Sequence, residues 1–252
     1  TTSKAWPVLY VNDNDASWSR SEQEKHITKA INHISQMQLN SGAFSLWRGG
    51  NRPEPWLSMY AMEFLQEAKA KGYEVPENLL INGMNYVENL DVDSMSVRAY
   101  ASYLRTKYGN ADPGEARYLA SKLSSNDFGV QSQVHLAATF GLLGDVLREQ
   151  RILSEVGSIN KSSWNRYDYR SHIRDQALFS YYVLDSDVVA QDFKSKVMEK
   201  LEGLYQDAKR ERYISTQEKG WLLRLASLNK DAKPLSENLS ISLDFKDAKL
   251  KD

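Results

Sequence analysis

The side chains best suited to chemistry are scarce in this chain. The 252 residues include no Cys, which excludes disulfides, thiolate metal ligands and Cys nucleophiles. The four His residues are scattered: His26, His33, His135 and His172. His135 lies on a predicted inner helix, from which it could face the centre of the fold. A lone His is usually hydrogen-bonded or on the surface, and we read His135 in that way.

Three further segments suggest ligand sites but do not meet their requirements. Residues 13–24 carry acidic side chains at part of the spacing of a calcium loop, yet Trp18 stands where that loop needs a turn Gly. The glycines of segment 42–50 are not a phosphate loop, because no strand precedes them and no Lys-Ser/Thr pair follows. Residues 170–175 combine Arg, His and Asp. We expect a helix start there with local ion pairs worth under about 1 kcal/mol each.

Four aromatic residues lie close together in the sequence: Phe44, Trp47, Trp56 and Tyr60. They fit either a surface on which a ligand stacks or a staple that holds two helices to the core. Aromatic side chains bury large apolar areas, and a fold built of helical hairpins needs such corners. We therefore favour the core staple.

Helical periodicity dominates the chain up to residue 238. The clearest helix-start signals are Ser19 or Ser21 with a Glu three residues later, Pro55, Asp112-Pro113, and Ser215 with Glu218. No convincing strand is found in this part of the chain.

The most apolar helices recur at intervals of about 40 residues, which fits one helical hairpin per repeat. Small residues occupy matching points in them: Ala61, Ala101, Ala138, Ala177 and Gly220. Such residues would let inner helices crowd around a common axis, and residues 1–6 could be the stub of a sixth inner helix. We predict an all-α fold, an α/α toroid of helical hairpins over residues 1–234. An open solenoid is the alternative, although no capping repeats are recognisable.

The last part of the chain differs in pattern. Residues 239–245 alternate apolar and polar side chains, which is typical of a half-buried strand. A single strand has no sheet to join here, so we assign residues 235–252 to an exit strand that leads into an absent β-rich domain.

Composition excludes several classes of function. The formal net charge is −1, with 32 basic and 33 acidic residues, which argues against nucleic acid as a partner. No apolar run approaches the length of a membrane span, so we expect no direct membrane insertion. No cofactor motif is present. Because the chain has neither a signal peptide nor an initiating Met, we interpret it as an excised piece of a larger protein.

Four segments together resemble the thioester domain of bacterial alpha-2-macroglobulins, the large envelope proteins that trap proteases. They are residues 36–76 with their Gly-aromatic turn and Pro-Trp helix start, Thr1-Thr2-Ser3, Ile173-Arg174-Asp175-Gln176-Ala177-Leu178, and Tyr213-Ile214-Ser215-Thr216-Gln217-Glu218. These segments span about residues 1–230 in the order found in the family.

The resemblance implies a specific chemistry for the parent protein. In the family, the Cys and Gln of a Cys-x-Glu-Gln motif form an internal thioester, which captures an attacking protease through a Lys amine. That motif normally continues into a Thr-Thr-Ser-like sequence, so it would lie immediately upstream of Thr1, Thr2 and Ser3. The chain itself contains no Cys and cannot form the bond. Complement-type members carry a His that assists transfer to hydroxyls. Residues 89–94 stand at its place and contain no His, so amines are the expected targets.

The resemblance also implies a toroid like that of terpenoid cyclases and prenyltransferases. The expected partners are target proteases and the neighbouring domains of the same parent chain. The expected location is the periplasm or the cell envelope, where the parent could be part of an inner-membrane-anchored lipoprotein. We expect no enzymatic activity. The alternative is an α/α-toroid enzyme acting on a polysaccharide or an isoprenoid, but neither an Asp-rich cyclase motif nor a zinc-binding Cys is present.

Overall fold

The computed structural model describes residues 2–10, 19–123, 128–157 and 171–228. Within these residues the chain forms eleven α-helices and one short 3-10 helix. The β pairing recorded among them is an isolated bridge between Gln38 and Phe44. The prediction of an all-α fold is therefore confirmed.

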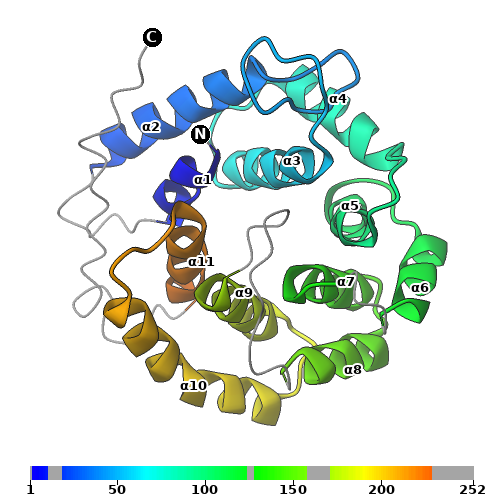
Figure 1. Ribbon diagram of the computed structural model, residues 1–252, viewed down its shortest axis with the longest axis vertical. Helices are drawn as coiled ribbons and strands as arrows, with labels where there is room; N and C mark the ends of the chain where they lie inside the picture. Colours follow the sequence, from blue (N-terminus) through cyan, green and yellow to red (C-terminus); the bar gives the residue numbers. More distant parts are fainter. Residues whose placement is uncertain (1, 11–18, 124–127, 158–170, 229–252) are drawn as a thin grey trace.

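The helices form two concentric rings, and Figure 1 shows the inner ring nearly end-on. The inner ring consists of α1 (Thr2–Ala5) with the 3-10 helix η1 (Pro7–Tyr10), α3 (Pro55–Ala70), α5 (Met95–Tyr108), α7 (Val130–Leu142), α9 (His172–Asp185) and α11 (Thr216–Ser227). The outer ring consists of α2 (Arg20–Ser35), α4 (Glu77–Glu88), α6 (Pro113–Ser121), α8 (Val146–Gly157) and α10 (Gln191–Arg210).

The inner ring is closed. Successive inner helices contact each other from α3 through α11, α11 then contacts both α1 and η1, and α1 contacts α3. The short segment 2–10 thus occupies the place of a sixth inner helix, as the sequence predicted. Closure of the ring is the observation that distinguishes a toroid from an open solenoid.

Local sequence signals explain where most helices begin. Ser19 and Glu22 form a reciprocal capping box at the start of α2, and Ser215 and Glu218 form another at α11. Asp112 caps α6 through the backbone N–H of Glu115, with Pro at the first helical turn. Pro55 likewise begins α3, but Glu54 before it makes no side-chain cap.

The small residues expected to let the inner helices pack closely are mostly buried. Ala61, Ala101 and Ala177 are buried, but Ala138 is only half-buried. A Cβ on Gly220 would lie 3.4 Å from the Trp6 Cβ, which is close to ordinary contact. Large aromatic and charged side chains, among them Trp6, Tyr100 and Arg174, also fill the interior.

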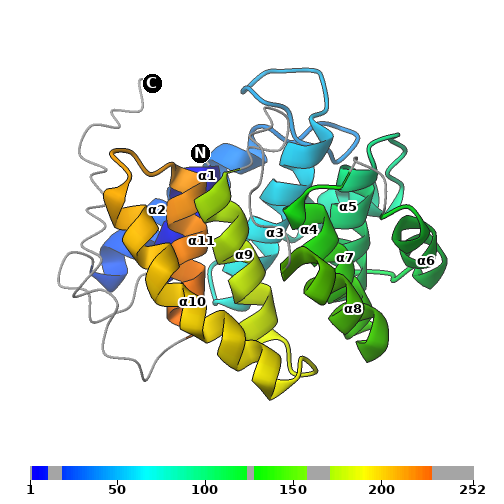
Figure 2. The ribbon, with the colours of Figure 1, turned by 60° about the horizontal axis from the view of Figure 1, so that its bottom comes forward.

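The exit strand predicted over residues 235–252 lies outside the described residues, as does the boundary at residue 234. Figure 2 shows that the start of α1, the loop before α3 and the loop before α11 lie at the same end of the toroid. We call this end the N-terminal face.

Candidate functional site at the toroid axis

Two charged side chains meet inside the ring. Glu63 of α3 and Arg224 of α11 are 0% and 2% exposed, and Arg224 Nη1 donates a hydrogen bond to Glu63 Oε1 at 3.0 Å. The Tyr100 hydroxyl of α5 donates to the second carboxylate oxygen. A buried charge is tolerated only when it is paired and hydrogen-bonded. This contact therefore ties three inner helices together.

Aromatic rings enclose the Arg224 guanidinium. Its central carbon lies 4.1 Å from the ring centroid of Trp221, 4.7 Å from those of Trp6 and Tyr181, and 5.6 Å from that of Tyr10. Cations at such distances are attracted to the faces of aromatic rings, most strongly where water is excluded. We call Trp6, Tyr10, Tyr181 and Trp221 the aromatic cage. It joins the N-terminal segment to α9 and α11.

His135 of α7 lies in the same core and is fully buried. Its ring is parallel to Tyr103 with centroids 5.1 Å apart, and it lies 4.0 Å from the Tyr100 ring. Neither ring nitrogen has a hydrogen-bond partner within the described part of the chain. Burial, reinforced by nearby positive charges, lowers the pKa of His135 well below its usual value. It does face the centre, so reading it as a hydrogen-bonded or surface His was wrong.

A second polar cluster lies on the same helices, one turn beyond Glu63. Glu67 of α3 accepts hydrogen bonds from Lys107 Nζ at 2.9 Å, from the Tyr108 hydroxyl at 2.8 Å and from the Tyr10 hydroxyl at 3.3 Å. Burial raises the pKa of Glu67, but the positive charges of Arg224 and Lys107, together with these hydrogen bonds, outweigh it and lower the pKa to about 2. The carboxylate is therefore ionised at neutral pH.

These clusters hold helices in register; no observation assigns them a substrate. Glu63, His135 and Arg224 are buried and in contact with other side chains. Two cavities of the described residues lie away from this cluster. One of about 440 Å³ lies against α6 and the α7–α8 turn, and another of about 550 Å³ is lined by residues of α8, α9 and α10.

The predicted thioester-adjacent residues are described only in part. Thr1 lies outside the described residues. Thr2 is buried and Ser3 is half-buried in the first turn of α1. Burial raises the pKa of Tyr60, and the nearby Ser3 side chain lowers it in part. The N-terminal segment is thus seated on α3.

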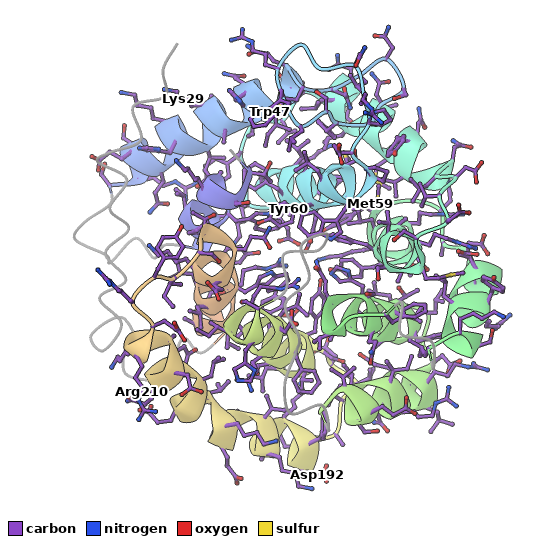
Figure 3. The ribbon with its side chains drawn as sticks, viewed as in Figure 1. Lys29, Trp47, Met59, Tyr60, Asp192 and Arg210 are labelled. Carbon is purple, nitrogen blue, oxygen red and sulfur yellow. The ribbon has the colours of Figure 1, made fainter. Side chains whose placement is uncertain are left out.

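The structure separates the four aromatic residues expected to act together. Phe44 and Tyr60 are buried in the core, and Trp56 is half-buried against it. Trp47 is 72% exposed on the loop before α3, where Figure 3 labels it apart from Tyr60. The loop backbone is fixed by hydrogen bonds from Ser45 Oγ and from the Gly50 N–H to the Trp47 carbonyl. Trp47 is a surface residue, whereas the other three contribute to the core.

The charged segment before α9 is more buried than the sequence suggested. Ser171 caps the helix, as expected for a helix start. Arg174 and Asp175 are 1% and 3% exposed, with Arg174 Nε and Asp175 Oδ1 2.7 Å apart, and Arg174 also donates to Gln131 of α7. The expected helix start and local ion pair are both present, but the pair is buried at the α7–α9 contact. The calcium-loop segment begins in residues that the structure does not describe.

Neither a metal site nor a membrane span is found where the structure can be assessed. The described residues contain no group of three or more His, Cys, Asp or Glu side chains arranged to hold a metal ion. No described helix combines the length and apolar character needed to cross a bilayer.

Sequence reasoning missed Glu63, Glu67 and Arg224, although a signal was present. In α3, both glutamates share the helical stripe of Tyr60 and Phe64, at spacings of three and four residues. In α11, Arg224 follows Trp221 by three residues on the buried face. A charge within an aromatic stripe indicates a buried pair, but the sequence does not show which helices supply its partners.

The fold and its filled axis define a class, the closed α/α toroid. No profile of a known protein family matches the chain. The chain is 26% identical over 255 residues to alpha-2-macroglobulin of Escherichia coli K12, an alignment that covers 92% of this chain and 15% of that protein. The alpha-2-macroglobulin homolog of Yersinia pestis is 24% identical, over 67% of this chain and 9% of that protein.

Solved structures show the same relationship. Trypsin-activated Escherichia coli alpha-2-macroglobulin matches with a TM-score of 0.77 and 25% identity, over 90% of this chain and 17% of that one. The native Escherichia coli structure from domain MG7 to the C-terminus matches with a TM-score of 0.78, over 92% of this chain and 40% of that one. The chain is thus similar over about nine tenths of its length to bacterial alpha-2-macroglobulins. This confirms the resemblance to the thioester-domain region of that family.

Proposed function

We propose that the chain acts as the thioester-type domain of a larger protease-trapping protein. The observation that carries this proposal is the match in sequence and fold over about nine tenths of the chain. The chain spans 15% of the Escherichia coli relative, so trapping is a property of the longer protein and not of this domain alone. Cleavage by a protease would rearrange that protein and bring the domain to the attacker.

The N-terminal segment has the geometry that this role requires. Thr2 and Ser3 begin an inner helix at the N-terminal face, and the chain would reach them directly from a Cys-x-Glu-Gln motif if the longer protein carries one. Stored acyl reactivity must be kept from water until it is needed. A bond anchored at the first turn of a packed inner helix would be held still, with its exposure decided by a neighbouring domain.

The same relationship supports our proposal for the partners and the location. The proposed partners are target proteases and adjacent domains of the same chain, and the proposed location is the bacterial periplasm or cell envelope. The enzyme alternative gains no support from the toroid axis, because buried aromatic side chains and Glu63–Arg224 fill the described interior.

The direct experiment uses the longer protein. It is incubated with trypsin or elastase and analysed on a denaturing gel, with and without prior treatment with methylamine. Where the longer protein carries the Cys-x-Glu-Gln motif, the proposal predicts a protease adduct that survives denaturation and disappears after the amine treatment. A protein that is cleaved without retaining any protease, covalently or in a native complex, would contradict the trapping function.

A further inference from the structure

The segment that closes the ring is too short to hold its own position. Helix α1 and helix η1 have four residues each. Isolated helices of that length do not persist in water, because nucleation costs more than so few hydrogen bonds return. The position of segment 2–10 must therefore come from its contacts with α2, α3 and α11.

Trp6 makes most of the aromatic contacts of segment 2–10. Its ring lies 5.6 Å from Phe64 and 5.8 Å from Tyr60, both on α3. From the other side, Arg224 of α11 covers it at 4.7 Å. Trp6 is thus held between the two helices that segment 2–10 joins.

Among the residues around Trp6, Arg224 is held in place by an ion pair, which it forms with Glu63. Its hydrogen bond to Glu63 crosses from α11 to α3, and Glu63 is held in turn by Tyr100. An apolar pair of similar volume would stabilise the fold about as well, but it would allow sliding that a directional hydrogen bond forbids. The pair therefore sets where the guanidinium lies, and the guanidinium sets where Trp6 lies.

We propose that Arg224, oriented by Glu63, is a positioning residue that fixes segment 2–10 in the ring. Resting on the proposed function, this would give the Glu63–Arg224 pair control over the placement of any acyl bond just upstream of Thr1. The pair joins α11 to α3, the two helices between which segment 2–10 closes the ring. Loss of the pair therefore loosens segment 2–10 before it unfolds the rest of the protein.

The test measures amide hydrogen exchange in the 252-residue chain. The variant Glu63→Gln/Arg224→Met removes both charges and keeps the volumes similar. Leu153→Ala serves as the control, because Leu153 is a buried residue of α8, on the other side of the ring. We expect exchange at the Trp6 and Leu9 amides to rise at least about tenfold in the double variant. Leu153→Ala should leave these two amides within about twofold of wild type, once differences in global stability are subtracted.

A second variant covers the case in which the double variant does not fold. Arg224→Lys keeps the charge paired with Glu63 but loses the planar guanidinium that covers Trp6, and we expect a smaller rise at the same two amides. Wild-type protection of Trp6 and Leu9 in whichever variant folds would overturn the proposal. This readout requires no thioester and no protease, so its failure is distinct from a failure of protease trapping.

Discussion

The indole of Trp56 lies nearly parallel to the Tyr60 ring, with centroids 5.2 Å apart and planes inclined by 20°. This stack joins the start of α3 to the centre of the toroid, because Tyr60 also contacts Trp6. Trp47, nine positions earlier, has no comparable burial. Two tryptophans of one loop–helix junction therefore have different roles.

Replacement of these tryptophans should separate the two roles. We expect Trp56→Ala to lower the free energy of unfolding by about 2 kcal/mol, less than for a fully buried Trp because Trp56 is only half-buried. Trp47→Ala should change it by less than about 0.5 kcal/mol. Denaturant unfolding of the two variants measures the difference, and equal losses would contradict this assignment.

Gly42 should tolerate no side chain. Its φ is +85°, and a Cβ would lie 1.9 Å from the Asn82 carbonyl oxygen of α4. Gly49 has a similar φ of +74° but open space around it. We expect Gly49→Ala to cost about 1 kcal/mol from backbone strain alone. Gly42→Ala should cost more than about 3 kcal/mol, since the loop must move away from α4. Thermal melts of the pair check this, and similar melting temperatures would refute it.

We expect the folded protein to become more stable when the Glu149 side chain loses its charge. One oxygen accepts from Ser186 Oγ at 2.9 Å, and the other has no hydrogen-bond partner among the described residues. Burial raises the pKa of this carboxyl. A raised pKa means that the folded state favours the neutral acid, so stability falls as the pH rises through that value. We expect Glu149→Gln to stabilise the fold by roughly 1 kcal/mol at pH 7. The gain should vanish in acid, and a variant less stable than wild type at pH 7 would argue against it.

We expect the contribution of Glu67 to stability to depend on pH in the opposite direction. Its pKa is lowered to about 2, below the usual 4.5, so the folded state favours the carboxylate. The stability that it contributes is present above about pH 4.5 and is lost as the pH falls toward 2. Its size is on the order of 3 kcal/mol. Glu67→Gln should therefore flatten the acid limb of the stability curve, while the exposed Glu24→Gln should leave it unchanged. An acid limb identical to wild type in Glu67→Gln would exclude this role.

How far the sequence predicted the fold depended on whether the information was local. Capping boxes at Ser19 and Ser215 and the Asp112-Pro113 start are encoded within four residues, and the structure contains each of them. The 40-residue spacing also predicted the rings, because each helical hairpin repeats the same local pattern of apolar residues. The Glu63–Arg224 pair spans 161 positions and was not predictable, because no local pattern shows that α11 returns to α3.

The exposure of Trp47 and the burial of His135 show the same limit. An aromatic residue near a predicted core helix is usually buried, but Trp47 is exposed on a loop whose backbone is held by hydrogen bonds. A lone His is usually hydrogen-bonded, but the rings of Tyr100 and Tyr103 pack against His135 instead. Both outcomes depend on packing between elements.

Peptide mapping of a protease adduct of the longer protein tests the central claim most directly. Where that protein carries a Cys-x-Glu-Gln motif, we predict that trypsin becomes linked within the few residues immediately upstream of Thr1, and that one thiol appears for each link formed. A link located elsewhere, or a protein that carries the motif yet forms no link and releases no thiol, would contradict the assignment of this toroid as a thioester domain.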